Sequence, residues 1–328
     1  MKSKILKFDI PSMTLRTELS PSKAPFDINY QTPTLGIGSC FVENMGQKLI
    51  DRQLPFHQNP FGIVYNPLSM AAQLAVLTTE KRFVESDLVE INGLFHSWLH
   101  HGFYSDDTVF STLNNINSSI DAARLFLKNT KRLFLTFGSA TVYALKTTGE
   151  TVANCHKAPP QYFDEKRLST AEIVAAFLPI IEKISAQIID LQIIITVSPV
   201  RHVRDGLIEN NLSKATLLLA ANELAQKFPN VTYFPAYELV IDDLRDYRFF
   251  ERDMMHPTAQ AVDYVWQFFS DTYFSEETKT VVREVEKIKA MQAHRPLKGL
   301  DTEGVKKFQQ SLVLKIAEVE KRFPFLSF

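Results

Sequence analysis

The chain has 328 residues, of which 45% are hydrophobic and 22% charged, and this composition excludes extensive disorder. Its 36 basic and 37 acidic residues leave a formal net charge of -1, which argues against binding to nucleic acid or acidic membranes through overall charge. The two cysteines, Cys40 and Cys155, cannot form a disulfide framework and favour a reducing compartment.

The N-terminal segment is punctuated by Pro and Ser, so residues 1–33 are predicted to form an extended arm over a larger body. This segment lacks an apolar core long enough for a signal peptide. No run in the chain approaches the ~18 apolar residues that a membrane helix needs. The protein is therefore expected to be cytoplasmic and to have no membrane partner.

The middle of the chain alternates short apolar runs with segments of helical periodicity. The apolar runs predict strands near residues 35–37, 132–137, 192–197 and 231–234. Helices are expected near 41–50, 70–77, 169–188, 214–228 and 257–269, with caps at Ser169 and Ser213. Asn-Pro pairs and a glycine predict a loop over 56–67. Continuous apolar strands separated by helices are typical of an α/β fold with a parallel sheet covered on both faces.

The character of the chain changes at about residue 275. Val281, Val285 and Ile288 form a narrow apolar stripe on a charged helix, and a second such helix is expected from Val305 to Arg322. Residues 275–328 are therefore predicted to form a C-terminal helical extension that buttresses the main domain. A homo-oligomer formed through these helices is the alternative.

Ligand sites of parallel sheets lie beyond the carboxyl ends of the strands. Three segments of this chain fall there, namely Gly38-Ser39, Gly138-Ser139 and Ser198 to Arg201. Arg201 follows its strand directly, so it is a candidate to bind a carboxylate or phosphate of the substrate.

Asp253 and His256 lie in the loop before the helix that is predicted to start near Pro257. A carboxylate three residues from an imidazole can hydrogen-bond to one ring nitrogen, which leaves the other nitrogen free to act as a base. The same two residues also fit a helix cap beside a surface imidazole. The pair by itself leaves both interpretations open.

Ser39 lies in the first strand-to-helix turn, where the amides of a helix N-terminus can stabilise a developing oxyanion. A serine hydroxyl becomes a nucleophile when a base removes its proton, and the predicted topology returns the His256 loop to this edge. Ser39 is therefore the candidate nucleophile, with a plain helix N-cap as the alternative. Cys40 is a rival nucleophile, but its side chain is expected to point into the helix or core behind Ser39.

The order of several motifs resembles the GSCFA family. The resemblance begins at Gly38-Ser39-Cys40-Phe41-Val42, where Val42 replaces the Ala of the family name, and it covers roughly Thr34 to Phe269. The other matching segments are Asn59–Gly62, Tyr65–Pro67, Ser97–Gly102, Asn154–Lys157, Ser198–His202, Tyr233–Glu238, Asp243–Arg248 and Asp253–Pro257.

The GSCFA family is similar to the SGNH/GDSL hydrolases, which have a flavodoxin-like three-layer fold and act mainly as esterases and lipases. The resemblance implies this fold for the present chain. It also implies that Ser39 is the nucleophile, His256 the base and Asp253 the acid that orients the imidazole.

The resemblance further implies oxyanion donors at the Ser39 amide and at Gly62. SGNH enzymes take a third donor from the Asn of a Gly-x-Asn-Asp motif. At that place the present chain reads Gly138-Ser139-Ala140-Thr141, without the Asn. Gly138 marks the position, and Ser139 or Asn154 is the candidate to replace the missing donor.

A metal site is the remaining alternative for the polar residues. Its candidate ligands are His100, His101, His156 and His202, together with Asp106, Asp107 or Asp205. None of them has the spacing of a known zinc motif. We therefore expect no metal and no other cofactor.

Residues 34–274 are predicted to form one domain with the site at the carboxyl edge of its sheet. The predicted function is that of a serine hydrolase that removes a small acyl group, such as acetyl, from a glycan or metabolite through an acyl-enzyme. A near-neutral chain fits such an ester better than a nucleic acid. An acyltransferase, a non-catalytic ligand-binding protein and a metal-dependent hydrolase are the alternatives.

Overall fold

A five-stranded sheet forms the centre of the structure, and all of its strands run parallel. The structure is a computed structural model, and it describes residues 16–294 and 303–328. The predicted arm residues 1–15, the segment 295–302 and the side chain of Asp205 lie outside the described part. The strands are β1 (Thr34–Gly38), β2 (Phe56–Gln58), β5 (Arg132–Phe137), β9 (Gln192–Val197) and β10 (Val231–Phe234).

The strand order across the sheet is β10-β9-β5-β1-β2. When these strands are numbered by their order in the chain, this is the 2-1-3-4-5 order of flavodoxin-like folds. Leu133 and Leu135 pack on one face of the sheet and Phe134 on the other, because successive side chains of a strand point to opposite faces. Both faces are buried, which explains the continuous apolar runs in the sequence.

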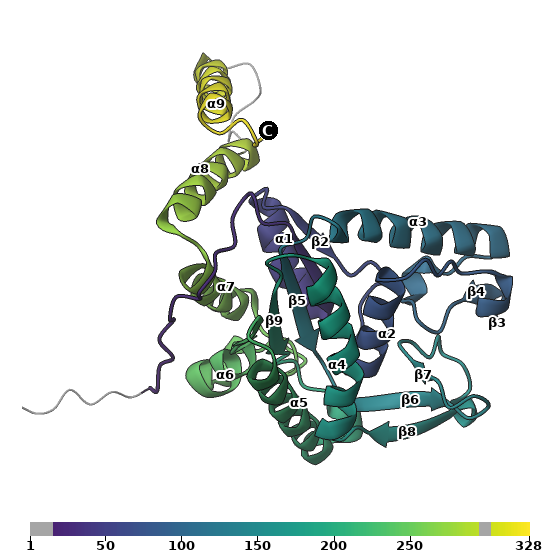
Figure 1. Cartoon of the computed structure of the whole chain (residues 1–328). Helices are drawn as coiled ribbons and strands as arrows, with labels where there is room; N and C mark the ends of the chain where they lie inside the picture. Colours follow the sequence, from purple (N-terminus) through teal and green to yellow (C-terminus); the bar gives the residue numbers. More distant parts are fainter. Residues whose placement is uncertain (1–15, 295–302) are drawn as a thin grey trace, which may run out of the picture.

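Helices cover both faces of the sheet (Figure 1). The predicted three-layer, flavodoxin-like α/β fold is therefore confirmed. One face carries α2 (Pro67–Leu77), α3 (Val109–Leu127), α4 (Thr170–Gln187) and α5 (Leu207–Lys227). The other face carries α1 (Cys40–Asp51) and α7 (Ala259–Tyr273), and beside them lies α6 (Ala236–Glu238), which continues into a π-helical turn at Leu239–Leu244.

Two antiparallel insertions interrupt the alternation of strands and helices. The first is a hairpin of β3 (Val89–Ile91) and β4 (Leu94–His96). The second is a three-stranded sheet in the order β7-β6-β8, which projects away from the central sheet (Figure 1). Its strands are β6 (Thr141–Leu145), β7 (Thr151–Val152) and β8 (Phe163–Arg167). Neither insertion was predicted, because their strands are short and mostly only partly buried.

Three details of the predicted elements are wrong. Residues 56–58 belong to the edge strand β2 instead of a loop, and β2 pairs with β1 on one side only. Helix α5 begins at Leu207, so Ser213 lies inside it, where its Oγ accepts the N–H of Ala140 at 2.7 Å. Helix α7 begins after its N-cap Thr258, which leaves Pro257 in the preceding loop. The capping box of Ser169 and Glu172 at the start of α4 is confirmed.

Residues 16–33 contain neither helix nor strand and pack along α7 and the turn that precedes it. The amides of Ala24 and Ile28 donate to the carbonyls of Thr272 and Tyr273 at 3.0 and 2.9 Å. At the start of this segment, Arg16 Nε donates to the buried Asp243 carboxylate at 2.7 Å.

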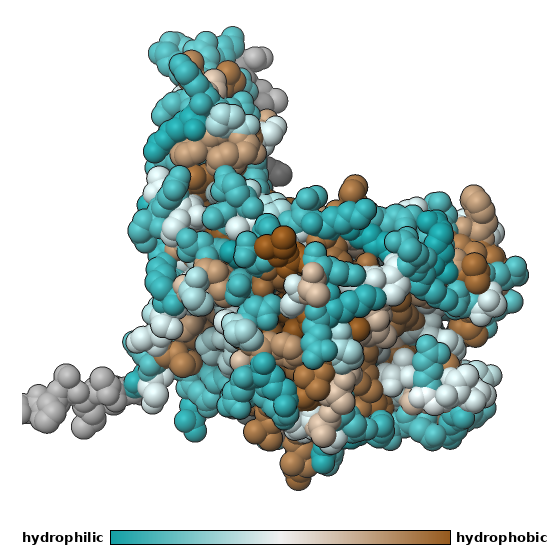
Figure 2. Space-filling view, in the orientation of Figure 1, coloured by the Kyte–Doolittle hydropathy of each residue, from teal (hydrophilic) through white to brown (hydrophobic). Residues whose placement is uncertain are grey.

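The C-terminal extension is a pair of helices, α8 (Glu276–Ala293) and α9 (Glu303–Arg322), that stands away from the body in Figure 1. Val285, Ile288 and Val319 are buried in its own small core. The outer surface of the pair is mainly hydrophilic in Figure 2. The predicted helical appendage is confirmed, and its role in self-association stays a prediction.

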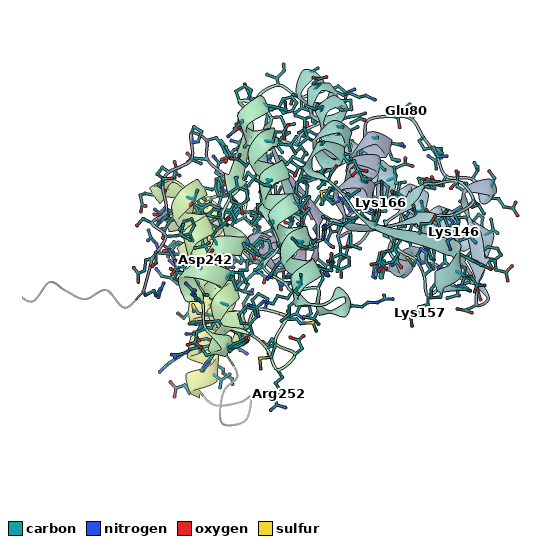
Figure 3. All side chains as sticks on the ribbon, turned by 90° about the horizontal axis from the view of Figure 1, so that it is seen from below. Glu80, Lys146, Lys157, Lys166, Asp242 and Arg252 are labelled. Atoms are coloured by element: carbon teal, nitrogen blue, oxygen red, sulfur yellow. The ribbon has the colours of Figure 1, made fainter. Side chains whose placement is uncertain are left out.

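Charged side chains such as Glu80, Lys157 and Arg252 lie at the periphery of the molecule (Figure 3). Within residues 16–294 and 303–328, no helix has both the length and the apolar composition required to cross a membrane. Short 3₁₀ segments complete the described elements at Glu85–Asp87, Gly102–Tyr104, Pro160–Tyr162, Val203–Asp205 and Tyr247–Phe249.

Candidate active site

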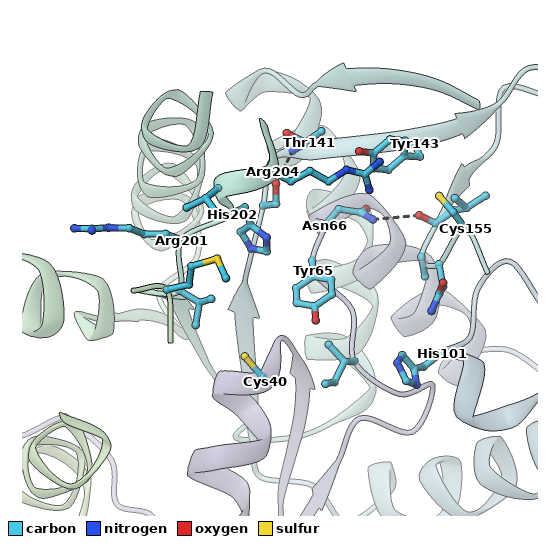
Figure 4. A pocket seen from close by; sticks show the side chains of 18 of the residues that line it. Cys40, Tyr65, Asn66, His101, Thr141, Tyr143, Cys155, Arg201, His202 and Arg204 are labelled. Carbon is cyan, nitrogen blue, oxygen red and sulfur yellow. Dashed lines mark hydrogen bonds between the residues drawn. The ribbon is translucent and has the colours of Figure 1, made fainter. Parts of the chain in front are cut away.

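A cavity of about 640 Å³ lies beyond the carboxyl ends of the central strands. Cys40 borders it just after β1, Ser139 just after β5, and Val200 shortly after β9. The three-stranded antiparallel insertion supplies another wall through β6 and the segment that follows β7 (Figure 4). His256, from the loop before α7, closes the remaining side. The cavity therefore occupies the place where parallel sheets bind their ligands.

Ser39 is the N-cap of α1, and its Oγ accepts the N–H of Phe41 at 3.3 Å. The residue is 1% exposed, and it is not among the residues that border the cavity. Cys40, the first residue of α1, is half-buried and borders the cavity. The expectation that the Cys40 side chain points into the core behind Ser39 is therefore wrong. The N-cap side chain turns back to an amide of its own helix. The next side chain, that of Cys40, borders the cavity.

Gly38 places this turn tightly against the sheet. Its φ is +153°, and a Cβ at this position would lie 2.5 Å from the carbonyl oxygen of Thr136 on β5. The Gly38 N–H donates to Asn59 Oδ1 at 2.9 Å, and its carbonyl accepts from Val64 N at 3.1 Å. Only glycine fits this approach, and the two hydrogen bonds hold the loop after β2 beside the turn.

Asp253 and His256 form the predicted pair. Asp253 Oδ2 lies 2.6 Å from His256 Nδ1, and Asp253 Oδ1 accepts the N–H groups of Met255 and His256 at 2.9 and 3.0 Å. These bonds, with the backbone N–H of His256 contributing most, lower the pKa of Asp253 to about 2. The carboxylate is therefore ionised, and Nδ1 donates to it while Nε2 faces away from it.

His256 borders two cavities that both touch the start of α1. It shares the large one with Cys40, and a small one of about 30 Å³ with Phe41 and Asn44. In the described part of the chain, no hydrogen bond joins His256 to Ser39 or Cys40. Catalytic hydrogen bonds are often long in the absence of substrate and shorten when it binds.

The amides of the predicted oxyanion glycines already have acceptors. Gly138 and Ser139 both donate their N–H groups to the carbonyl of Tyr65, at 2.8 and 3.0 Å. The N–H of Gly62 donates to the carbonyl of Asn59 at 2.7 Å within a turn. These amides hold the cavity walls together and are not free to bind an oxyanion in this conformation.

Three other predicted residues border the cavity. The Ser139 hydroxyl accepts the N–H of Thr141 at 3.0 Å, and Asn154 Oδ1 accepts the N–H of His156 at 2.8 Å. Arg201 places its guanidinium over the Phe250 ring, 5.0 Å from the centroid, and Figure 4 shows it directed away from the cavity centre. In the same view Arg204 extends across the cavity toward Asn66 and Tyr143. The structure thus gives Arg204 the position expected for Arg201.

Lys214 is a residue of the candidate site that was not predicted from the sequence. It is 1% exposed and lies beneath the cavity, where its Nζ donates to the carbonyls of Gly138 and Ser198 at 2.6 and 2.7 Å. These carbonyls follow β5 and β9, so Lys214 joins the ends of the two strands. A detectable signal was present, because Lys214 shares the buried face of α5 with Leu217, Ala221 and Leu224.

Burial lowers the pKa of Lys214 from its ordinary value of 10.5 to about 7, and the neighbouring Cys40 acts in the opposite direction. Between these two values the unfolded chain binds a proton that the folded protein has released. The free energy of unfolding should therefore contain a contribution that rises from pH 7 to pH 9. Lys214→Met should reduce this rise, as measured by urea unfolding at the two pH values.

Lys227→Met is the matched control, since Lys227 lies on the same helix and its side chain is 45% exposed. We expect this variant to keep the pH dependence of the wild-type protein. Equal pH dependence in all three proteins would contradict a buried Lys214 that titrates near neutrality.

His202 was predicted only as a metal candidate, and it proves to be a half-buried residue of the cavity wall. Its ring meets the Tyr65 ring edge-on at 5.4 Å between centroids. Burial, with smaller contributions from Lys214 and His256, lowers its pKa to about 4, so the imidazole is neutral at pH 7. Its Nε2 is buried without a hydrogen-bond partner among the described residues.

The described residues contain no group of three or more His, Cys, Asp and Glu side chains arranged to hold a metal ion. The nitrogens of two candidate ligands are bonded within the protein instead. His156 Nε2 lies 2.9 Å from the carbonyl of Ser97, and His100 Nδ1 lies 2.9 Å from the Ser97 hydroxyl.

Comparison with known proteins gives a family and several distant structural likenesses. An acetyl xylan esterase (Est2A) from the rumen bacterium Butyrivibrio proteoclasticus is 10% identical, with a TM-score of 0.36, and the match covers 74% of this chain. This chain spans only 63% of the length of that protein. A carbohydrate esterase family 3 protein from Talaromyces cellulolyticus is 8% identical, with a TM-score of 0.31, and the match covers 78% of this chain and 99% of that one.

No curated protein matches the chain. The model of the GSCFA family matches residues 33–269, which include the whole central sheet, the Gly38 turn and the Asp253–His256 loop. The match spans well over half of the chain and agrees with the extent of the resemblance in the sequence. The protein therefore belongs to the GSCFA family.

Proposed function

We propose that this protein hydrolyses a carboxylic ester through an acyl-enzyme, with the reaction centred between the start of α1 and His256. The observation that carries the proposal is the Asp253–His256 pair at 2.6 Å on the wall of the cavity that Cys40 also borders. A carboxylate-oriented imidazole beside a nucleophile-bearing turn is the arrangement that activates a hydroxyl or thiol for acyl transfer.

In the proposed reaction, a side chain of the Ser39-Cys40 turn attacks the ester carbonyl. His256 Nε2 takes the proton of the nucleophile and then gives it to the leaving alcohol, while Asp253 stabilises the imidazolium. Water attacks the acyl-enzyme in the second half, again with His256 as the base. The N-terminal amides of α1 are the donors that would stabilise the oxyanion, together with His202 Nε2 or the side-chain amide of Asn154.

The proposed substrate is a small acyl ester of a glycan or metabolite. A cavity of about 640 Å³ is in the ordinary range for small-molecule sites. Tyr65 and Tyr143 offer aromatic walls to such a ligand, and Arg204 offers a cation at its rim. The same first half-reaction serves an acyltransferase, in which an acceptor alcohol replaces water.

The test is turnover of p-nitrophenyl acetate, butyrate and octanoate by the purified protein. We expect nitrophenol release with kcat/KM falling as the acyl chain lengthens, because the acyl group must fit beside α1. An added alcohol that raises nitrophenol release and lowers the yield of free acid would identify acyl transfer. A folded protein that turns over none of these esters, nor any acetylated oligosaccharide, would favour the non-catalytic binding protein instead.

A further inference from the structure

We propose that the nucleophile is the thiol of Cys40 and not the hydroxyl of Ser39. This inference rests on the proposed function, since it names the attacking group of that reaction. It depends on which of the two neighbouring side chains reaches the cavity.

The two side chains of the turn differ in their access to the cavity, because Cys40 borders it and Ser39 does not. Ser39 is 1% exposed and its Oγ is occupied as the cap of α1. Cys40 is half-buried, and Figure 4 shows its sulfur rising from the start of α1 into the cavity. A substrate in the cavity therefore meets the thiol first. To attack the same substrate, Ser39 would have to release its helix amide and become exposed to the cavity.

The candidate base and the thiol border the same cavity. His256 borders the cavity together with Cys40, and it also contacts the space beside Phe41 and Asn44, in the first turns of the same helix. Two cavities that His256 borders therefore both touch α1 near its start. This arrangement puts the imidazole on the same side of the fold as the helix turn that bears Cys40.

The surroundings of the thiol include groups that favour a thiolate as well as groups that oppose it. Burial and the nearby Glu43 raise the pKa of Cys40, while its own amide, the Phe41 amide and the buried Lys214 act to lower it. The net direction is upward, so the resting group is a thiol. It needs a base at the moment of attack, which is the task that the Asp253–His256 pair can perform.

Cys155 is the natural comparison because it is the other cysteine of the chain. It is also half-buried and borders the same cavity, but from the segment after β7, on the side away from α1 (Figure 4). Arg204 is the cation near it. Cys155 has the same thiol chemistry, but in Figure 4 it lies away from the N-terminus of α1.

The proposed reaction has two halves, acylation of the Cys40 thiol and its deacylation by water. The Cys40 sulfur forms a bond to the acyl carbon, its proton passes to His256, and the bond from the acyl carbon to the alcohol oxygen breaks with return of that proton to the alcohol. Water then adds to the thioester and loses a proton to His256. The carbon–sulfur bond breaks, the acid departs, and the sulfur regains the proton.

The experiment uses the full-length protein with p-nitrophenyl acetate, quenched in acid and analysed by intact mass and peptide mapping. We expect one acetyl group on Cys40, removed by neutral hydroxylamine, which cleaves thioesters and spares the oxygen esters of serine. The adduct should be absent from Cys40→Ala and present in both Cys155→Ala and Ser39→Ala. Circular dichroism of each variant shows that it is folded.

If the acyl-enzyme does not accumulate, turnover by the variants distinguishes the two candidate nucleophiles. Cys40→Ala should lower kcat/KM at least ~10³-fold, and Ser39→Ala should stay within ~10-fold of the wild-type value. A hydroxylamine-resistant adduct on Ser39, an adduct on Cys155, or loss of turnover in Ser39→Ala with Cys40→Ala active would overturn the inference and leave the proposed function standing. Absence of both adduct and turnover in the wild-type protein would instead refute the proposed function.

Discussion

Replacement of His256 by alanine is expected to lower kcat/KM for p-nitrophenyl acetate by at least ~10³-fold. The reason is that His256 acts as the base through its Nε2. Its other ring nitrogen, Nδ1, is bonded to Asp253 at 2.6 Å. Without the base, a thiol or hydroxyl at the α1 turn is a poor nucleophile at neutral pH.

Asp253→Asn should produce a large loss of the same kind at every practical pH. The pKa of Asp253 is lowered to about 2, so its carboxylate is ionised throughout the range of an activity assay, and the substitution removes that charge. An Asn also reverses the hydrogen bond if its amide faces the ring, which favours the wrong tautomer of His256.

His294→Ala is the matched control for these variants. His294 follows α8 in the C-terminal extension, and its ring lies 5.2 Å from the Phe308 ring between centroids. We expect its loss to leave kcat/KM unchanged. Activity that survives His256→Ala but falls in His202→Gln would move the base to His202, the other imidazole on the cavity wall.

Gly38→Ala is expected to lower the free energy of unfolding by at least about 3 kcal/mol. A Cβ at Gly38 would lie 2.5 Å from the carbonyl oxygen and 2.9 Å from the amide nitrogen of Thr136. Both atoms belong to the backbone of β5, in the centre of the sheet, so β1 and β5 must move apart to admit the methyl group. The measurement is urea unfolding followed by circular dichroism.

Gly149→Ala separates this clash from backbone strain. Gly149 also has a positive φ, +72°, but a Cβ there would meet no atom within 4 Å. Its replacement should cost only about 1 kcal/mol, the strain of a left-handed backbone. If the two variants lost the same free energy of unfolding, the close approach of β1 to β5 would not be the cause of the loss in Gly38→Ala.

The strands of the central sheet were predictable because burial on both faces leaves a continuous apolar run. The predicted strands 132–137, 192–197 and 231–234 coincide with β5, β9 and β10. β2 was missed because it is a three-residue edge strand without fully buried side chains. The strands of the insertion were missed because β8 is exposed over four of its five residues, so it carries no apolar signal.

The local sequence also predicted the geometry of two loops of the candidate site. Asp253 and His256 are three residues apart, and a short turn is enough to bring their side chains together, so this pair could be inferred before any fold was known. Gly38 and its neighbours marked a tight strand-to-helix turn for a similar reason. The roles of these residues in catalysis stay predictions.

Composition and charge described a near-neutral globular protein, and the order of its motifs identified the family. Only the tertiary structure decided that Cys40, and not Ser39, faces the cavity, and that Lys214 lies buried beneath it. The physical reason is that both facts depend on groups far apart in the chain. The direction of the Cys40 side chain matters because His256 and Tyr65 border the same space, and Lys214 is buried because two strand ends offer it carbonyl acceptors.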